Sequence, residues 1–174
     1  MALFLFMILT KKEILKLIRN KKIKIEPFDS SSVGPASIDL TLDSNLRIFK
    51  KDNHILEIKE DFDYKKVTEL IDISNGFVLN PGELVLGITK EKITLPENIA
   101  AWINSRSRFA RVGLMSHITA PFISPGVSNK QVLEIYNAGQ EKLKLFPGIK
   151  ICQLVFQECK GKAKYQGMFK NQEL

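Results

Sequence analysis

A chain of 174 residues is long enough for one domain that buries about two-thirds of the surface of its unfolded chain. Its hydrophobic and charged fractions, 44% and 26%, exclude fibrous and disordered classes. The formal net charge is +7, but acidic residues separate the lysines and no basic stripe carries aromatic residues, so we expect neither a nucleic-acid nor a membrane partner.

The first residues, 1–9, are mostly apolar and are interpreted as an N-terminal extension of a single domain over residues 1–174. They are too short to span a bilayer and lack the basic start and small-residue cleavage site of a secretory signal. A start at Met7 would give a strand followed by a helix, so residues 1–6 are interpreted as dispensable.

A helix is predicted directly after this segment. Thr10 stands at an N-cap position and Glu13 follows three residues later, as in a capping box. The apolar residues then recur at helical spacing until about Asn20: Ile14, Leu15, Leu17 and Ile18.

The remainder of the chain is predicted to be built mainly from strands. Turn residues such as Pro-Gly pairs separate short apolar or alternating runs, whereas residues 61–71 are charged and ambiguous. No repeat or linker interrupts the series, which favours one β-barrel or sandwich with one or two helices. The predicted strands are 37–42, 46–49, 55–58, 77–79, 84–88, 99–103, 118–123, 132–136, 143–145 and 151–156.

The two cysteines, Cys152 and Cys159, make neither a disulfide framework nor a C-x-x-C metal motif. Cys152 lies in an apolar run and is expected in the core. Free cysteines favour a reducing, cytoplasmic compartment.

Two segments carry the chemistry. Residues 105–114 are dense in arginines and hydroxyls, which pair well with phosphate oxygens. Glu134 lies in an apolar run, where a carboxylate is costly to bury unless it is paired or chemically employed. On a strand, Val132 and Tyr136 would share its face while Leu133 and Ile135 face the other side. Together these segments predict a small phosphorylated substrate and proton transfer.

Six motifs in order resemble the dCTP deaminase family of the trimeric dUTPase-like superfamily. The resemblance covers residues 8 to 167 and implies a distorted β-barrel of jelly-roll type, the dUTPase-like β-clip, with one or two short helices. It also implies a homotrimer and Mg²⁺ bound through a nucleotide triphosphate, and it leaves open whether dTTP inhibits. The motifs are GPASIDLT (34–41), NPGE (80–83), SRS through GLM (105–115), HITA (117–120), VLEIYNAG (132–139) and KYQG (164–167).

By this resemblance Glu134 is the general acid/base, and Ser107 and Arg111 position the water and the 4-amino end of the base. Arg106, with the backbone N–H groups of 108–110, would hold phosphates, and backbone groups of 118–120 would read the cytosine edge. His117 is expected to be a structural neighbour. The substrate-binding set is Arg106, Ser107, Arg108, Phe109, Ala110, Arg111, Thr119, Ala120, Ser124, Val132, Leu133, Glu134, Lys164 and Tyr165.

A zinc-dependent deamination needs an H-x-E…P-C-x-x-C ligand set. The chain has only His54 and His117 and no paired cysteines, so we expect no protein-bound metal and a carboxylate that carries the protons.

Two positions depart from the family pattern. Ser124 stands where dUTPases and bifunctional members have an aspartate that activates water for pyrophosphate hydrolysis, and a serine cannot act as that base. Met168 replaces the glutamine of the C-terminal lid, assigned here to residues 160–174. We therefore expect conversion of dCTP to dUTP and ammonia. The alternatives are a dUTPase, a bifunctional deaminase-dUTPase, or a weakened nucleotide-binding homologue.

Overall fold

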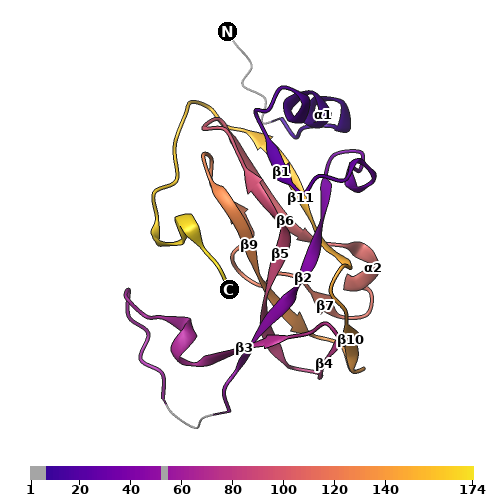
Figure 1. The fold of residues 1–174 in the computed structure, drawn as a ribbon, viewed down its shortest axis with the longest axis vertical. Coiled ribbons are helices and arrows are strands. Elements are labelled where there is room, and N and C mark those ends of the chain that lie inside the picture. Colours follow the sequence, from indigo (N-terminus) through magenta and orange to yellow (C-terminus); the bar gives the residue numbers. More distant parts are fainter. Residues whose placement is uncertain (1–6, 52–54) are drawn as a thin grey trace.

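A large antiparallel sheet forms the body of the molecule in the computed structural model, which describes residues 7–51 and 55–174 (Figure 1). Within these residues the sheet has nine strands in the order β7-β9-β5-β2-β11-β6-β8, with β1 paired to β5 and β3 to β2. A separate pair, β10-β4, completes the strands. Their bounds are β1 Lys24–Glu26, β2 Ile38–Phe49, β3 Thr68–Asp72, β4 Phe77–Leu79, β5 Leu84–Thr94, β6 Ile99–Ser105, β7 Leu114–Met115, β8 Phe122–Ile123, β9 Ser128–Asn137, β10 Leu143–Leu145 and β11 Lys150–Glu158.

The core lies on the inner face of this sheet because the long strands alternate buried and partly exposed residues. Along β9, Leu133 and Ile135 are fully buried and Glu134 between them is not. The neighbouring strands contribute Leu40, Leu42, Leu46, Ile93, Leu154 and Phe156 to the same cluster. Burial of these apolar side chains supplies the main favourable free energy of folding.

The predicted N-terminal helix is confirmed as α1, Lys11–Arg19, with Thr10 and Asn20 as its caps. Ile14 is fully buried, and Leu15, Leu17 and Ile18 pack against the core. The capping box is wrong, because the Thr10 side chain caps nothing and Glu13 instead pairs with Lys16 at 3.2 Å. Residues directly before the helix belong to the fold, since Leu9 is buried and its N–H donates to the Phe156 carbonyl at 2.9 Å.

The predicted strands 37–42 and 46–49 are one strand, β2. Its pairing with β5 shifts register between Leu42 and Leu46, so one continuous strand carries an irregularity where the sequence pattern breaks. The predicted strand at 55–58 is wrong: Ile55 and Ile58 are 95% and 79% exposed and no strand pairs with them. The partner of β2 is β3, from the segment that the sequence left ambiguous.

Short helical turns connect the strands on the surface. Two are 3₁₀ turns between strands: η1, Ser30–Ser32, capped by the Asp29 side chain, and η2, Tyr64–Lys66, capped by Asp63. A third, η3, Met168–Asn171, lies near the C-terminus, and α2, Ser107–Ala110, is one turn of α-helix. None of the described helices is long and apolar enough to cross a membrane.

The predicted strand at 118–123 is only partly right. Phe122 and Ile123 form β8, but 116–120 is an irregular segment that turns toward β9. The cysteine prediction is confirmed: Cys152 is fully buried in β11 and free, and Cys159 is free and partly exposed. His54 lies outside the described residues.

Two glycines bring α2 against the turn after β9. Gly113 has a φ of +83°, and a Cβ there would lie 2.3 Å from the Gly139 backbone nitrogen. A Cβ on Gly139 would in turn lie 2.6 Å from the Val112 carbonyl oxygen. Only glycine at both positions allows these two backbone segments to touch.

We predict that Gly113→Ala lowers the free energy of unfolding by about 3 kcal/mol, because a left-handed φ and an overpacked backbone contact both add cost. Gly148→Ala is the matched control: its φ is +85°, yet a Cβ there meets nothing within 4 Å. The control should lose only about 1 kcal/mol. Equal losses in urea unfolding of the two variants would show that the Gly113–Gly139 contact is unimportant.

Candidate functional site

Glu134 is held by the irregular segment that follows β7. Its Oε2 accepts hydrogen bonds from the backbone N–H groups of Ile118 and Thr119 at 2.9 and 2.7 Å. Its Oε1 has only a long contact, 3.4 Å, with the Thr119 hydroxyl. The carboxylate thus has one oxygen bound by the protein and one largely free.

Two opposing effects act on the pKa of Glu134. Partial burial raises it, while hydrogen bonds from the backbone N–H groups of Thr119, Ile118 and Ala120 lower it, and the pKa lies below its ordinary value. Glu134 is therefore ionised at neutral pH, the state that a general base requires.

A cavity of about 540 Å³ opens beside this carboxylate. Six of the predicted site residues line it: Thr119, Ala120, Ser124, Val132, Glu134 and Tyr165. The other lining residues among those described are mostly apolar, and Glu134 is the one acidic side chain in the set. A concave, mainly apolar wall with a few polar groups is typical of a small-molecule site.

His117 lines the cavity next to Glu134. Burial lowers its pKa, and the charge of Glu134 opposes that shift without cancelling it. The His117 Nδ1 is buried without a hydrogen-bond partner among the described residues. His117 is thus a mainly neutral imidazole at the cavity wall whose Nδ1 is buried and unpaired among the described residues.

The arginine-rich segment lies elsewhere. Ser107, Arg108, Ala110 and Arg111 are exposed on or beside α2, and none of them lines the cavity. In Figure 1, α2 and the C-terminal segment, which walls the cavity, lie on opposite sides of the sheet. The chain therefore does not bring Ser107 and Arg111 to its own Glu134.

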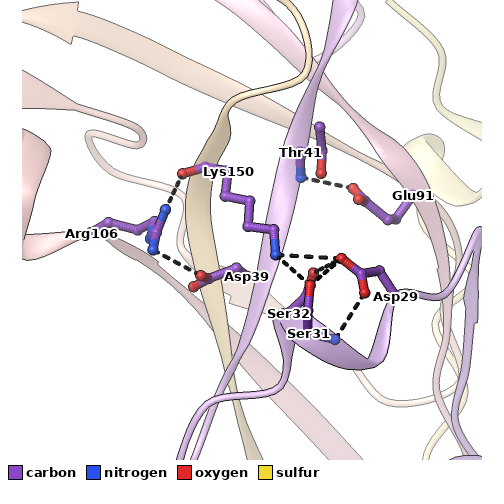
Figure 2. Close-up of polar contacts among 8 residues, drawn as sticks. All are labelled: Asp29, Ser31, Ser32, Asp39, Thr41, Glu91, Arg106 and Lys150. Carbon is purple, nitrogen blue, oxygen red and sulfur yellow. Dashed lines mark hydrogen bonds and ion pairs between the residues drawn. The ribbon is translucent and has the colours of Figure 1, made fainter.

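The Arg106 side chain binds other groups of the same chain (Figure 2). Its guanidinium pairs with Asp39 at 2.9 Å and donates to the Lys150 carbonyl at 2.9 Å. The backbone N–H groups of Phe109 and Ala110 donate to the Arg106 carbonyl at 2.9 and 3.0 Å. These groups, predicted to bind phosphate, therefore hold α2 in place in this structure.

Of the remaining predicted residues, one lines the cavity and two do not. Leu133 is fully buried in the core and does not line the cavity. Lys164 is exposed and lies against Gly126, where a Cβ would lie 3.0 Å from the Lys164 Cα. Tyr165 donates its backbone N–H to the Pro125 carbonyl at 3.0 Å and lines the cavity.

Several lining residues were not predicted, among them Tyr64, Asn129, Gln131 and Phe169. Asn129 and Gln131 are 5% exposed, on the inward face of β9, and hydrogen-bond to each other at 2.7 Å. Two polar residues at inward positions of a strand were the available signal, because buried amides need partners. Among the described residues no group of three or more His, Cys, Asp or Glu side chains could hold a metal ion.

The sequence of this chain matches a family of known proteins. The model of the dCTP deaminase-like family matches residues 8–159. A dCTP deaminase, dUMP-forming, of Kocuria rhizophila is 40% identical over 153 residues, which cover 86% of this chain and 79% of the relative. An enzyme of the same name from Pseudarthrobacter chlorophenolicus is 37% identical over 171 residues, covering 95% and 88%.

Solved structures agree on the fold. The 2'-deoxycytidine 5'-triphosphate deaminase of Agrobacterium tumefaciens superposes with a TM-score of 0.70 at 23% identity, covering 88% of this chain and 48% of that one. A Staphylococcus bacteriophage 80alpha dUTPase superposes with a TM-score of 0.51 at 14% identity, covering 84% of this chain and 96% of that one. The predicted dUTPase-like β-fold with short helices is thereby confirmed, and the chain belongs to the dCTP deaminase-like family.

Proposed function

We propose that this protein deaminates dCTP, with Glu134 as general acid/base. The observation that carries the proposal is the ionised Glu134 carboxylate at the wall of a cavity of nucleotide-compatible size, in a chain 40% identical to a dCTP deaminase. The sequence departures at Ser124 and Met168 leave Glu134 and its N–H donors in place.

The two carboxylate oxygens of Glu134 suit different tasks. Oε2 is fixed by the Ile118 and Thr119 N–H groups, which orient the carboxylate. Oε1 is free to accept a proton from a water that attacks C4 of the cytosine. Glu134 then passes this proton to the C4 amino group, the C4–N4 bond breaks with release of ammonia, and the remaining hydroxyl proton moves to N3 to give uracil.

Ser107 and Arg111 complete the site only if a neighbouring copy supplies them. Both are exposed and neither lines the cavity, and α2 lies across the sheet from the C-terminal segment in Figure 1. A homotrimer with cyclic symmetry would place α2 of one copy against the cavity of the next and give equivalent sites. In that arrangement Arg111 and Ser107 position the water and the 4-amino group, and Arg108, exposed beside them, meets phosphate oxygens.

Residues 160–174 act in this proposal as the lid of the single domain. Tyr165 already lines the cavity, and Lys164 lies exposed beside it, where its ammonium can reach a triphosphate. Mg²⁺ would be held by phosphate and water oxygens, which it prefers, and supplies charge neutralisation when bound. A thymidine triphosphate inhibitor would use the same phosphate contacts.

The product is proposed to be dUMP, because the relatives at 40% and 37% identity are named dUMP-forming. This replaces dUTP, the product expected from the sequence. The second candidate, release of dUTP, is favoured by Ser124, which lines the cavity where a carboxylate would activate the second water. When dUMP is the product, a second water attacks the α-phosphorus of dUTP and diphosphate leaves.

We predict that Glu134→Gln lowers the deamination rate at least about a hundredfold, as expected for loss of a general acid/base. The amide oxygen can still accept from the Ile118 and Thr119 N–H groups, so the fold and nucleotide affinity should be largely kept. Ammonia release measures the rate, and calorimetry with dCTP is the control. Near-normal turnover would refute the role of Glu134.

Mixing two inactive variants tests the shared site. Glu134→Gln and Arg111→Ala chains, refolded together in equal amounts, should regain roughly a quarter of the wild-type activity, because random assembly pairs an intact Glu134 with an intact neighbouring Arg111 at that frequency. Each variant refolded alone is the control, and light scattering should give three times the 19.8 kDa chain mass. A trimer without recovery would place both groups in one chain.

Ser124→Asp decides between the products. Incubation of the unmodified protein with dCTP and Mg²⁺ should give dUMP and diphosphate. If dUTP accumulates instead, no other group does the work of the aspartate that Ser124 replaces. In that second case Ser124→Asp should raise dUMP formation by about 10² or more, the usual contribution of such a base. Chromatography of the nucleotides measures both, and a lack of any deamination would refute the proposed function.

A further inference from the structure

The C-terminal strap, defined here as residues 164–174, lies along the cavity rather than in solvent. Phe169 and Gln172 of the strap line the cavity together with Tyr165. Within the strap, the Phe169 N–H donates to the Tyr165 hydroxyl at 3.3 Å, which folds the η3 turn back on itself. The strap therefore has a defined position along the cavity wall.

Two of the contacts that hold this position come from β9. The Asn129 side chain donates to the Phe169 carbonyl at 2.8 Å, and the Gln172 side chain donates to the Lys130 carbonyl at 2.8 Å. Both contacts lie on the cavity wall, so substitutions there would change the site as well as the strap.

A third contact comes from the connection between β2 and β3. The Tyr64 hydroxyl donates to the Glu173 carbonyl at 3.0 Å, near the free end of the strap. Figure 1 shows the η2 turn and the C-terminal segment approaching the same side of the sheet from opposite ends. The bond joins residues 109 positions apart in sequence, beside the cavity that Tyr64 and Gln172 both line.

Tyr64 is itself fixed to the sheet. Its carbonyl accepts a hydrogen bond from the Thr68 hydroxyl at 2.9 Å, and the Arg47 guanidinium lies 5.9 Å from its ring centre. The Asp63 side chain caps the turn through the Lys65 N–H at 3.0 Å. Burial, opposed by Arg47, raises the pKa of Tyr64, so the phenol keeps the proton that it donates.

We propose that Tyr64 is a positioning residue whose hydroxyl latches the C-terminal strap closed over the nucleotide cavity. The proposal rests on the proposed function for its kinetic consequence but not for the latch itself. Tyr64 touches the strap backbone, so it acts on any residue type at Glu173, and it contacts no group assigned to the chemistry. Its effect is on how often the strap is open.

Tyr64→Phe removes the hydroxyl and keeps the ring against Arg47 and the cavity. Loss of one partly exposed hydrogen bond should raise amide hydrogen exchange of residues 165–173 about threefold to tenfold. The matched control is Tyr136→Phe, since the Tyr136 hydroxyl makes no hydrogen bond with the described residues and should leave strap exchange unchanged. Unchanged exchange in Tyr64→Phe would overturn the latch, whether or not the protein acts on dCTP.

Kinetics then test the consequence. If the strap closes on bound nucleotide, Tyr64→Phe should raise KM for dCTP by about the same factor and leave kcat nearly unchanged, the pattern of lost uniform binding. A fall in kcat at constant KM would overturn the positioning role and assign Tyr64 to the chemical step. Absence of dCTP turnover in the unmodified protein would refute the proposed function alone, because the exchange measurement needs no activity.

Discussion

The contact between the Glu134 carboxylate and the backbone N–H groups of residues 118–120 determines the shape of the site. These N–H groups would belong to a strand if the segment continued the pattern that ends at Ile123. They turn instead toward β9, because a half-buried carboxylate offers stronger acceptors than a neighbouring strand would. Ile118, Thr119 and Ala120 of this turn line the cavity together with Glu134. The same hydrogen bonds therefore lower the pKa of the proposed base and orient its carboxylate at the cavity wall.

A second polar arrangement holds the arginine-rich segment on the opposite side. Arg106 is bound by Asp39 of β2 and by the carbonyl of Lys150 in β11, and Lys150 in turn donates to Ser31 at 3.1 Å. Figure 2 shows these groups as one continuous cluster beside Asp29. Together with the Gly113–Gly139 contact, the cluster fixes both ends of α2. Ser107 and Arg111 are thereby exposed on a turn that is anchored at both ends, which suits the role proposed for them.

The strands and the helix were predictable where the residue pattern is local. Burial alternates along β9 as the sequence indicated, and the stripe of α1 faces the core because its spacing matches the helical period. The strand predicted at 55–58 is wrong because a short apolar run does not show whether a partner strand is present. The strand predicted from residue 118 is wrong at its start, because the N–H groups of Ile118 and Thr119 donate to the Glu134 side chain, 16 and 15 positions away. The family resemblance named six of the cavity residues, Glu134 among them, but could not reveal Tyr64, whose contribution depends on where two distant segments meet.

The distribution of thiols makes the strap accessible to spectroscopy. Burial raises the pKa of the Cys152 thiol, aided by Glu91 and Asp39, so it stays protonated and unreactive in β11. Cys159 is partly exposed and follows β11 directly, with its backbone N–H bound to the Asn98 carbonyl at 2.9 Å. The sequence thus already contains one attachment point for a fluorophore or spin label, between β11 and the strap. A second probe on the strap would then report its distance from Cys159, while the buried Cys152 stays unlabelled.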